Sequence, residues 1–290
     1  MDKHFSFSFI IPHKNTPDLL SRCIKSIPER DDIQVIIVDD NSDPEKKPLV
    51  SHSNTEVVLL DAEQSKGAGR ARNIGIEHAK GKWVLFADSD DYYCEGFLGI
   101  LENELNDDLD ILYFNILSED DDPENRANIW IRKYESYFHS EKRDFIKYAF
   151  NEPWNKVVSR ELIINSGVRF EERPSGNDVM FSMEIGAAAQ NVKFINEHLY
   201  YLTNQPNSIV NRKRSFEHVY NKLDLSIKHD TFNKEHGLEE LRHPLMTFKK
   251  LYFLYKRYGL KNTIKYLKKL SENRSVIIEL LKSITYKAKK

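Results

Sequence analysis

The chain has 290 residues, of which 40% are hydrophobic and 30% charged, and its formal net charge is −2. This length suits one large α/β domain with a helical extension, and the composition is that of a folded protein, not a disordered one. The net charge argues against a general affinity for nucleic acid. The chain contains no run of about 18 apolar residues, the length needed to span a bilayer. The two cysteines give no disulfide framework, and the N-terminal residues lack the apolar stretch of a signal peptide, so we expect a cytoplasmic protein.

Strand and helix signals alternate over residues 1–115. We expect helices from Pro17, with Thr16 as the N-cap, and over residues 69–79. Nearly continuous apolar runs predict strands at residues 5–11, 34–38, 57–60, 82–87 and 109–117. Such strands, separated by amphipathic helices, indicate an α/β fold with a mostly parallel sheet and helices on both of its faces. Ligands of these sheets bind beyond the carboxyl ends of the strands.

Acidic residues follow two of the expected strands. Asp39 and Asp40 end the second strand, and Asp88, Asp90 and Asp91 follow the fourth. Carboxylates are oxygen ligands suited to Mg²⁺ or Mn²⁺, and a metal held by few carboxylates keeps positions for substrate phosphates. Asp40 is also placed to accept hydrogen bonds from a base or a ribose. The alternative is that both acidic runs are solvated turns that cap helices.

The segment KGAGRARN, residues 66–73, has a partial likeness to the glycine-rich loop of dinucleotide-binding folds. Its third glycine position holds Arg72, and it follows the third expected strand and not the first, which disfavours a dinucleotide oxidoreductase. Glycines with Arg70 and Arg72 at a helix start instead suit contacts to a nucleotide or a diphosphate. The alternative is that both arginines lie on a solvated face.

Four segments, in this order and spacing, carry a family resemblance: FSFIIPHKN, VIIVDDNS, GAGRARNIGI and WVLFADSDDYY. Together they resemble the family 2 glycosyltransferases, strongly over residues 5–115 and more weakly as far as residue 202. The resemblance implies a GT-A fold, a Rossmann-like α/β domain that binds a nucleotide-sugar. We expect residues 1–115 to form its nucleotide-sugar half, residues 116–210 its acceptor and catalytic-base half, and residues 211–290 a C-terminal helical extension.

The resemblance also implies roles for residues near the donor. Asp40 is similar to the acid that meets the uracil, and Arg72 matches a basic residue near the nucleotide. His13 stands where the family more often has a small or β-branched residue, which leaves the base preference open. The residues expected at the nucleotide are Pro12, His13, Asn15, Asp40, Arg70, Arg72 and Asp88.

The run from Asp88 to Asp91 resembles the D-x-D motif of the family. The resemblance therefore implies Mn²⁺ or Mg²⁺ as the cofactor. Asp90 is the expected metal ligand, and Asp91 and Asp88 assist it.

Two later segments, WNK at residues 154–156 and GNDVMF at residues 176–181, resemble the W-x-K and later acidic motifs of the family. By this resemblance Asp178 is the catalytic base, and Trp154 and Lys156 lie at the acceptor. Many members have Glu-Asp where this chain has Asn177 and Asp178. As alternatives, Asp178 caps a helix over residues 179–189, and Trp154 is a core residue.

The implied reaction is an inverting transfer of a hexosyl or N-acetylhexosaminyl group from a nucleotide-sugar, with UDP expected, to a glycan or lipid-linked acceptor. The metal offsets charge on the leaving diphosphate, and Asp178 takes a proton from the acceptor hydroxyl. One alternative is a sugar-phosphate nucleotidyltransferase, against which the lack of an N-terminal glycine-rich phosphate loop argues. The other is a non-catalytic subunit that binds a nucleotide-sugar, against which the intact Asp178 argues.

The C-terminal tail is strongly basic. Residues 251–290 contain eleven Lys or Arg against two Glu, and their apolar positions keep helical spacing. A basic amphipathic helix can lie on the surface of an anionic membrane, which would place the protein peripherally on the inner face. The alternative is that these helices pack on the catalytic domain and leave their lysines solvated.

Overall fold

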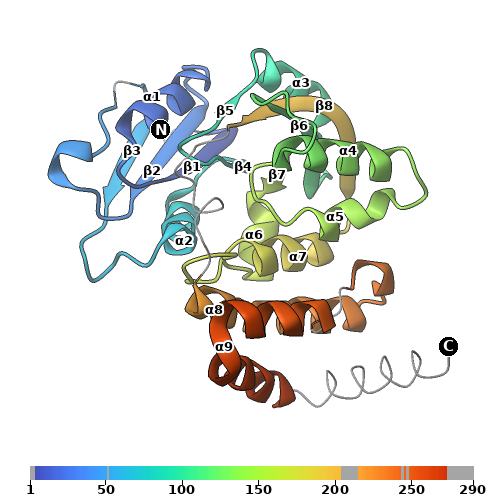
Figure 1. Ribbon diagram of the computed structural model, residues 1–290. Helices are drawn as coiled ribbons and strands as arrows, with labels where there is room; N and C mark the ends of the chain where they lie inside the picture. The colour runs from blue at the N-terminus through green and yellow to red at the C-terminus, as the bar shows by residue number, and fades with distance from the viewer. Residues whose placement is uncertain (1–3, 51, 204–214, 243–244, 246–247, 273–290) are drawn as a thin grey trace. The chain divides into compact units, whose positions relative to one another are not determined.

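The computed structural model describes residues 4–50, 52–203, 215–242, 245 and 248–272. Two compact units, Met1–Ser208 and Ile209–Lys290, divide the chain (Figure 1). The larger unit contains the sheet, and the described residues of the smaller unit form helices.

The larger unit is built on a sheet of eight strands among the described residues, in the order β3-β2-β1-β4-β7-β6-β8-β5. β1 pairs in parallel with β2 and β4, β2 with β3, and β6 with β8. β7 runs antiparallel between β4 and β6, and β5 runs antiparallel to β8. The predicted mostly parallel sheet is confirmed, with two antiparallel strands that the sequence did not reveal. The strands are β1 (Phe7–His13), β2 (Ile33–Asp39), β3 (Thr55–Leu59), β4 (Trp83–Phe86), β5 (Tyr92–Tyr93), β6 (Ile111–Ser118), β7 (Lys156–Ser159) and β8 (Val192–Leu202).

Helices cover both faces of this sheet (Figure 1). The α-helices of this unit are α1 (Pro17–Lys25), α2 (Ala68–His78), α3 (Phe97–Glu104), α4 (Arg126–Phe138), α5 (Ile146–Ala149), α6 (Arg160–Ser166) and α7 (Val179–Ala188), and the short 3-10 helices are η1 (Pro44–Lys46) and η2 (Arg143–Phe145). Successive residues of β1 face opposite layers. The Phe9 ring lies 6.0 Å from the Phe97 ring of α3, whereas Ile10 packs against Gly75 of α2. A strand buried on both faces explains why β1 appears in the sequence as an unbroken apolar run.

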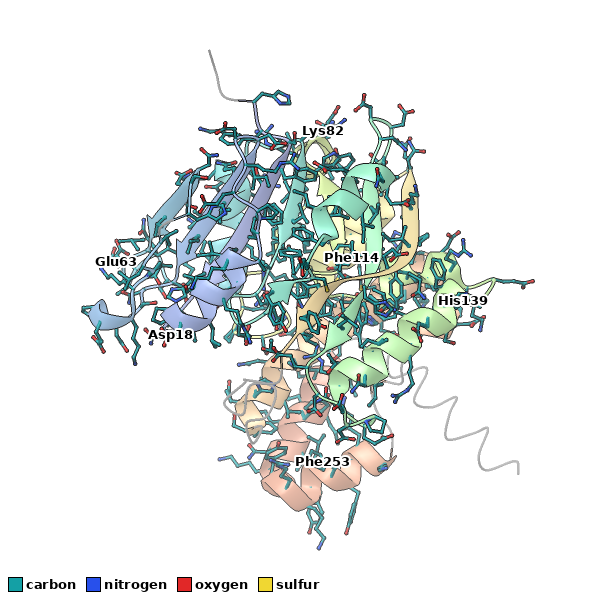
Figure 2. All side chains as sticks on the ribbon, turned by 90° about the horizontal axis from the view of Figure 1, so that it is seen from above. Asp18, Glu63, Lys82, Phe114, His139 and Phe253 are labelled. Carbon is teal, nitrogen blue, oxygen red and sulfur yellow. The ribbon has the colours of Figure 1, made fainter. Side chains whose placement is uncertain are left out.

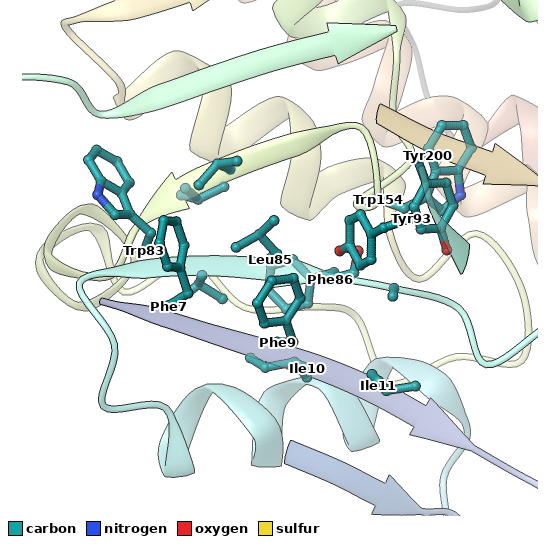
Figure 3. Packing of buried hydrophobic residues seen from close by; sticks show 14 of the residues in the cluster. Phe7, Phe9, Ile10, Ile11, Trp83, Leu85, Phe86, Tyr93, Trp154 and Tyr200 are labelled. Carbon is teal, nitrogen blue, oxygen red and sulfur yellow. The ribbon is translucent and has the colours of Figure 1, made fainter. Parts of the chain in front are cut away.

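Aromatic side chains fill the core near the carboxyl ends of β1 and β4. Figure 3 shows Phe9 and Phe86 on these strands, and Tyr93, Trp154 and Tyr200 beyond the end of β4. The Tyr200 ring packs edge-on against Tyr93 and stacks on Trp154, at centroid distances of 5.1 Å and 5.7 Å. Because Tyr200 belongs to β8, this cluster joins β8 to the acidic segment that follows β4.

The elements expected over residues 1–115 are present, with ends shifted by a few residues. The helix from Pro17 is α1, and Thr16 occupies its N-cap position but makes no side-chain capping bond. Its hydroxyl lies 3.3 Å from the Ser89 hydroxyl, so it contacts the acidic segment after β4 instead. The sequence did not predict α3 or the two-residue strand β5.

The smaller unit packs α8 (Phe216–Glu235) against α9 (Phe248–Ser271), with the 3-10 helix η4 (Glu239–Leu241) between them in sequence. Gly259, with φ 80° and ψ 169°, bends α9 into two halves, and this conformation is open essentially to glycine alone. The predicted C-terminal helical extension is confirmed over its described residues. The helical spacing and the basic residues expected beyond residue 272 lie outside the residues that the structure describes. None of the described helices has the length and apolar character needed to cross a membrane.

Candidate active site

The parallel strands β2, β1 and β4 place the two predicted acidic runs at one edge of the sheet. His13 of β1 is in register with Asp39 of β2, and the Asp40 N–H donates to the His13 carbonyl oxygen at 2.8 Å. β4 lies on the other side of β1, and Asp88 follows its last residue by two positions. Segments far apart in the sequence therefore meet where a parallel sheet binds its ligands.

His13 is committed to the protein interior, with its side chain fully buried. Its Nδ1 lies 2.7 Å from Asp39 Oδ1, and the Thr16 N–H donates to its Nε2 at 3.1 Å. Because Nε2 accepts this bond, the proton of the neutral ring sits on Nδ1 and is donated to Asp39. Asp39 also accepts bonds from the Ser42 N–H and hydroxyl, at 3.0 Å and 2.5 Å. His13 thus braces the ends of β1 and β2, and both ring nitrogens have protein partners.

Pro12 and Asn15 lie on either side of this brace. Pro12 is buried in β1, in register with Val38. Asn15 has a positive φ of 59° and links the loops that follow β1 and β2. Its N–H donates to Ser42 Oγ at 2.8 Å, and its Oδ1 accepts from the Asp43 N–H at 2.8 Å. Asn15 therefore holds the two loops in a fixed relation.

Asp40 joins the end of β2 to the glycine-rich segment before α2. One carboxylate oxygen accepts from Lys14 Nζ at 3.3 Å, and the other accepts from the Gly67 N–H at 3.2 Å. Gly67 has φ 86°, so the chain turns there into α2 with backbone N–H groups available at the helix start. Arg70, one turn further on, is partly exposed and pairs with Glu172 at 3.4 Å.

α2 packs directly on the segment that precedes α7. The Asn73 side chain makes two bonds with the Phe170 backbone, donating to its carbonyl oxygen at 2.9 Å and accepting from its N–H at 2.8 Å. Gly69 approaches so closely that an added Cβ would lie 2.2 Å from the Glu171 carbonyl oxygen. These contacts fix residues 170–178 relative to α2.

Arg72 bridges the end of β4 and the start of the α7 segment. Its Nη2 donates to Asp88 Oδ1 at 2.5 Å, and its Nη1 donates to Asn177 Oδ1 at 2.9 Å. The guanidinium lies 5.4 Å from the centre of the Phe170 ring, a cation–π contact. Arg72 is 5% exposed, which rules out a solvated face for it, whereas Arg70 keeps about a third of its side chain exposed.

Asp88, Asp90 and Asp91 converge at the carboxyl end of β4. One carboxylate oxygen from each lies within 4.8 Å of the other two. Asp91 is 2% exposed, and its two oxygens accept from the Thr203 N–H at 2.8 Å and the Tyr200 hydroxyl at 3.2 Å. Burial and the charge of Asp88 raise the pKa of Asp90 to about 6. Burial, Asp88 and Asp90 likewise raise the pKa of Asp91.

The chemistry of these three carboxylates fits a divalent cation. Their oxygens are the ligands that Mg²⁺ and Mn²⁺ prefer, and a cation would offset the repulsion that, together with burial, raises the pKa values of Asp90 and Asp91. Among the described residues Asp90 forms no salt bridge, and one of its carboxylate oxygens lies within 4.8 Å of an oxygen of Asp88 and of Asp91. Its backbone carbonyl accepts from Arg22 Nη2 at 2.6 Å and Thr203 Oγ1 at 2.7 Å, which holds the segment in place.

Asp178 occupies the N-cap position of α7, but its side chain makes no capping hydrogen bond. The carboxylate is therefore not engaged in the cap that was the alternative to catalysis. Burial raises the pKa of Asp178, and Glu152 and Asp88 add to this increase, while Arg72 opposes it. A carboxylate with a raised pKa is a stronger base than an exposed aspartate.

Trp154 and Lys156 are 3% and 0% exposed. Trp154 stacks on Tyr200 and so takes the core position that was one of its two alternatives. Lys156 Nζ donates to the Phe150 carbonyl oxygen at 3.3 Å, and burial lowers the pKa of this ammonium to about 7. Direct contact with an acceptor, as predicted for both, would require these side chains to leave the core.

Glu152 is a candidate residue that the motifs missed. Its two oxygens accept from Arg126 Nη2 at 3.1 Å and Trp130 Nε1 at 3.0 Å, both from α4. The carbonyl of the preceding residue accepts from Ser182 Oγ at 2.7 Å, which ties this loop to the first turns of α7. Glu152 therefore lies on the Asp178 side of the site. Its one sequence signal is its place in the segment that carries the W-x-K motif.

A family model described as Glycosyl transferase family 2 matches residues 8–167, more than half of the chain. The chain belongs to glycosyl transferase family 2. This confirms the predicted enzyme class, a glycosyltransferase. The match includes the acidic cluster after β4 and the W-x-K segment, and it ends before Asp178.

Relatives and solved structures agree with this assignment. EpsH of Bacillus subtilis, named as a glycosyltransferase, is 28% identical over 83% of this chain and 73% of its own length. The GalNAc(5)-diNAcBac-PP-undecaprenol beta-1,3-glucosyltransferase of Campylobacter jejuni is 29% identical over 59% of this chain, and the match spans 56% of that protein. The structure of S. aureus TarS 1-349 in complex with UDP-GlcNAc has a TM-score of 0.69 at 20% identity and covers 92% of this chain and 80% of that one. The predicted GT-A fold is confirmed.

Proposed function

We propose that this glycosyltransferase moves a hexosyl or N-acetylhexosaminyl group from a UDP-sugar to a hydroxyl of a glycan or lipid-linked acceptor, with inversion. The UDP-GlcNAc complex of TarS, which shares the fold, supports the donor class. The undecaprenol-linked acceptor in the name of the Campylobacter relative supports the acceptor class. The proposal includes peripheral contact of the C-terminal helices with the membrane that would carry such an acceptor.

The observation that carries the proposal is the position of Arg72 between Asp88 and Asn177. Sugar transfer needs positive charge beside the leaving diphosphate and a base at the acceptor hydroxyl, with the anomeric carbon between them. Arg72 contacts the acidic cluster with one nitrogen and the neighbour of Asp178 with another. A guanidinium is suited to diphosphate oxygens because it presents several fixed N–H donors.

The donor nucleotide would lie along the carboxyl ends of β1 and β2. We assign the uracil and ribose contacts to Asp40 and Asn15, beside the buried Pro12. His13 supports this pocket from behind through Asp39, since both of its ring nitrogens are already bonded. Arg70, at the exposed start of α2, is within the segment that would face the diphosphate.

Asp90 and Asp91, with Asp88, would hold Mn²⁺ or Mg²⁺, and the ion would supply a Lewis acid for the charge of the leaving UDP. Arg72 adds a second positive charge at the same place. Asp178 takes the proton of the acceptor hydroxyl while the hydroxyl oxygen attacks the anomeric carbon from the face opposite the diphosphate. A single displacement inverts the configuration and forms no covalent enzyme intermediate. Trp154 and Lys156 would act through the core, by supporting the loop that carries Glu152.

Product analysis tests this proposal against its two alternatives. With UDP-GlcNAc or UDP-glucose and Mn²⁺ we expect release of UDP as the sugar is transferred. Release of pyrophosphate in sugar-phosphate reactions would instead indicate a nucleotidyltransferase. Tight donor binding without any transfer would indicate a non-catalytic binding subunit. A thermal-shift panel of UDP, GDP and their sugars, with and without Mn²⁺, identifies the nucleotide first, because a ligand of the folded state raises the melting temperature.

A further inference from the structure

Helix α9 exposes an unusual number of large apolar side chains. Ten large hydrophobic residues are exposed in the described part of the chain, and five of them lie on α9: Tyr252 at 62%, Phe253 at 44%, Tyr255 at 52%, Leu260 at 61% and Ile264 at 56%. Figure 2 labels Phe253 on this helix. The opposite side of α9 packs in the core of the smaller unit through Leu254, Tyr266 and Leu270. Within this unit, each half of α9 therefore keeps an exposed side.

Lysines share the uncovered side with these apolar residues. In the first half of α9, Lys249, Tyr252, Phe253 and Lys256 recur at the three- and four-residue spacing of one helix face. In the second half, beyond the bend at Gly259, Leu260, Ile264 and Lys268 recur every four residues, with Lys261 beside them. We use the name α9 outer face for the exposed rows of both halves taken together: Lys249, Tyr252, Phe253, Tyr255, Lys256, Leu260, Lys261, Ile264 and Lys268.

Positive and negative residues are unevenly distributed between residues 1–247 and residues 248–290. Residues 248–290 contain 13 of the 43 Lys and Arg residues but only two of the 45 Asp and Glu residues. Residues 1–247 therefore contain 30 basic and 43 acidic residues. Near an anionic surface, residues 248–290 are attracted while residues 1–247 are repelled.

The chemistry of the outer face favours a lipid surface over other anionic partners. Leu260 and Ile264 offer no hydrogen bonds to phosphates or bases, so they add nothing to the phosphate contacts on which general nucleic-acid binding depends. Aliphatic residues that insert among acyl chains, tyrosines at headgroup depth and lysines whose stems reach the phosphates are typical of helices that lie in a membrane interface.

We propose that the α9 outer face binds the surface of an anionic membrane. Leu260 and Ile264 insert below the headgroups, and Lys249, Lys256 and Lys261 contact the lipid phosphates. This inference deepens the proposed function, because it brings the enzyme to a lipid-linked acceptor. Vesicle binding requires no sugar transfer, however, so failure of one can be distinguished from failure of the other.

Sedimentation of the full-length chain with vesicles tests the proposal. We expect the protein to pellet with phosphatidylglycerol-containing vesicles at low salt, less so at high salt, and not with pure phosphatidylcholine vesicles. The double substitution Leu260→Ser/Ile264→Ser should weaken binding at least roughly tenfold, because the apolar contacts are lost. The matched control is Leu49→Ser/Ile164→Ser, which makes the same change at exposed residues of the larger unit, 83% and 47% exposed, and should leave binding unchanged.

Two results would overturn the proposal, provided that thermal unfolding shows each variant to be folded. One is a wild-type chain that stays in the supernatant with phosphatidylglycerol vesicles at low salt. In that case another part of the chain or a second copy covers the outer face, and a concentration-dependent rise in mass would identify the second copy. The other is a Leu260→Ser/Ile264→Ser variant that binds as tightly as the wild type.

Discussion

Replacement of Gly69 by alanine would test how the segment with the catalytic base is held. Gly69 is the second residue of α2, and an ideal Cβ there would lie 2.2 Å from the Glu171 carbonyl oxygen and 3.0 Å from Asn177 Cβ. A comfortable contact needs roughly 3.5 Å, so α2 and this segment must separate by about 1 Å. The obstacle is a backbone atom, so no side-chain rotation can relieve it.

This separation affects stability and transfer by different amounts. Overpacking of this kind costs about 1–3 kcal/mol of unfolding free energy, which corresponds to a melting temperature lower by roughly 2–10 °C. Asp178 follows Asn177 directly and moves with it, and a displacement of about 1 Å at a reacting group can reduce the rate on the order of a hundredfold. UDP affinity should change less, because Asp40 and Asp90 lie on other segments and only Arg70 and Arg72 among the proposed donor contacts lie on α2.

Gly99→Ala is the matched control for this substitution. Gly99 lies in α3, and no atom is within 4 Å of the position that its added Cβ would take. Alanine there should maintain the unfolding free energy or raise it by about 0.5–1 kcal/mol. Thermal unfolding, UDP calorimetry and single-turnover transfer would be measured for both variants. A Gly69→Ala protein with the melting temperature and transfer rate of the wild type would refute this account of how Asp178 is positioned.

Three further predictions concern the base itself. Asp178→Asn keeps the size of the side chain but removes the base, so transfer should fall at least about a hundredfold while UDP affinity stays within a few-fold; a fully active variant would place the base elsewhere. Burial, Glu152 and Asp88 raise the pKa of Asp178 against the opposing effect of Arg72, and the base acts only when deprotonated, so the rate should rise with pH through a pKa above the usual range of an aspartate. Glu152→Gln removes one of the charges that raise this pKa and should move the rise to lower pH; an unchanged pH–rate profile would show that Glu152 does not act on Asp178.

The part of the site that lies at strand ends is predictable from the sequence. β1, β2 and β4 are buried on both faces, so each gives an apolar run whose end is easy to recognise. Asp40 and the cluster of Asp88, Asp90 and Asp91 follow such runs directly. Because parallel neighbours end at the same edge, their approach in space follows from the order of the elements.

The remaining features depend on contacts between distant segments. Lys156 begins the short antiparallel strand β7 and is fully buried, which is rare for a lysine; the W-x-K resemblance, from which its place at the acceptor was expected, gives no sign of this burial. Glu152 takes its hydrogen bonds from α4, and Tyr200 reaches Asp91 from β8, 109 residues away in sequence. Asp178 stands at a helix start, where the sequence alone cannot tell a cap from a base, and its missing capping bond is visible only in the fold.

Calorimetric titration of UDP tests most directly the claim that the acidic cluster holds a metal at the donor site. Wild-type protein and the Asp90→Ala variant would each be titrated with Mn²⁺ and again with a chelator. We expect tight UDP binding only in the titration of the wild type with Mn²⁺. Binding should be much weaker in the other three titrations, because removal of either the ion or its main ligand leaves the diphosphate charge uncompensated. Equal affinities in all four titrations would contradict the metal assignment.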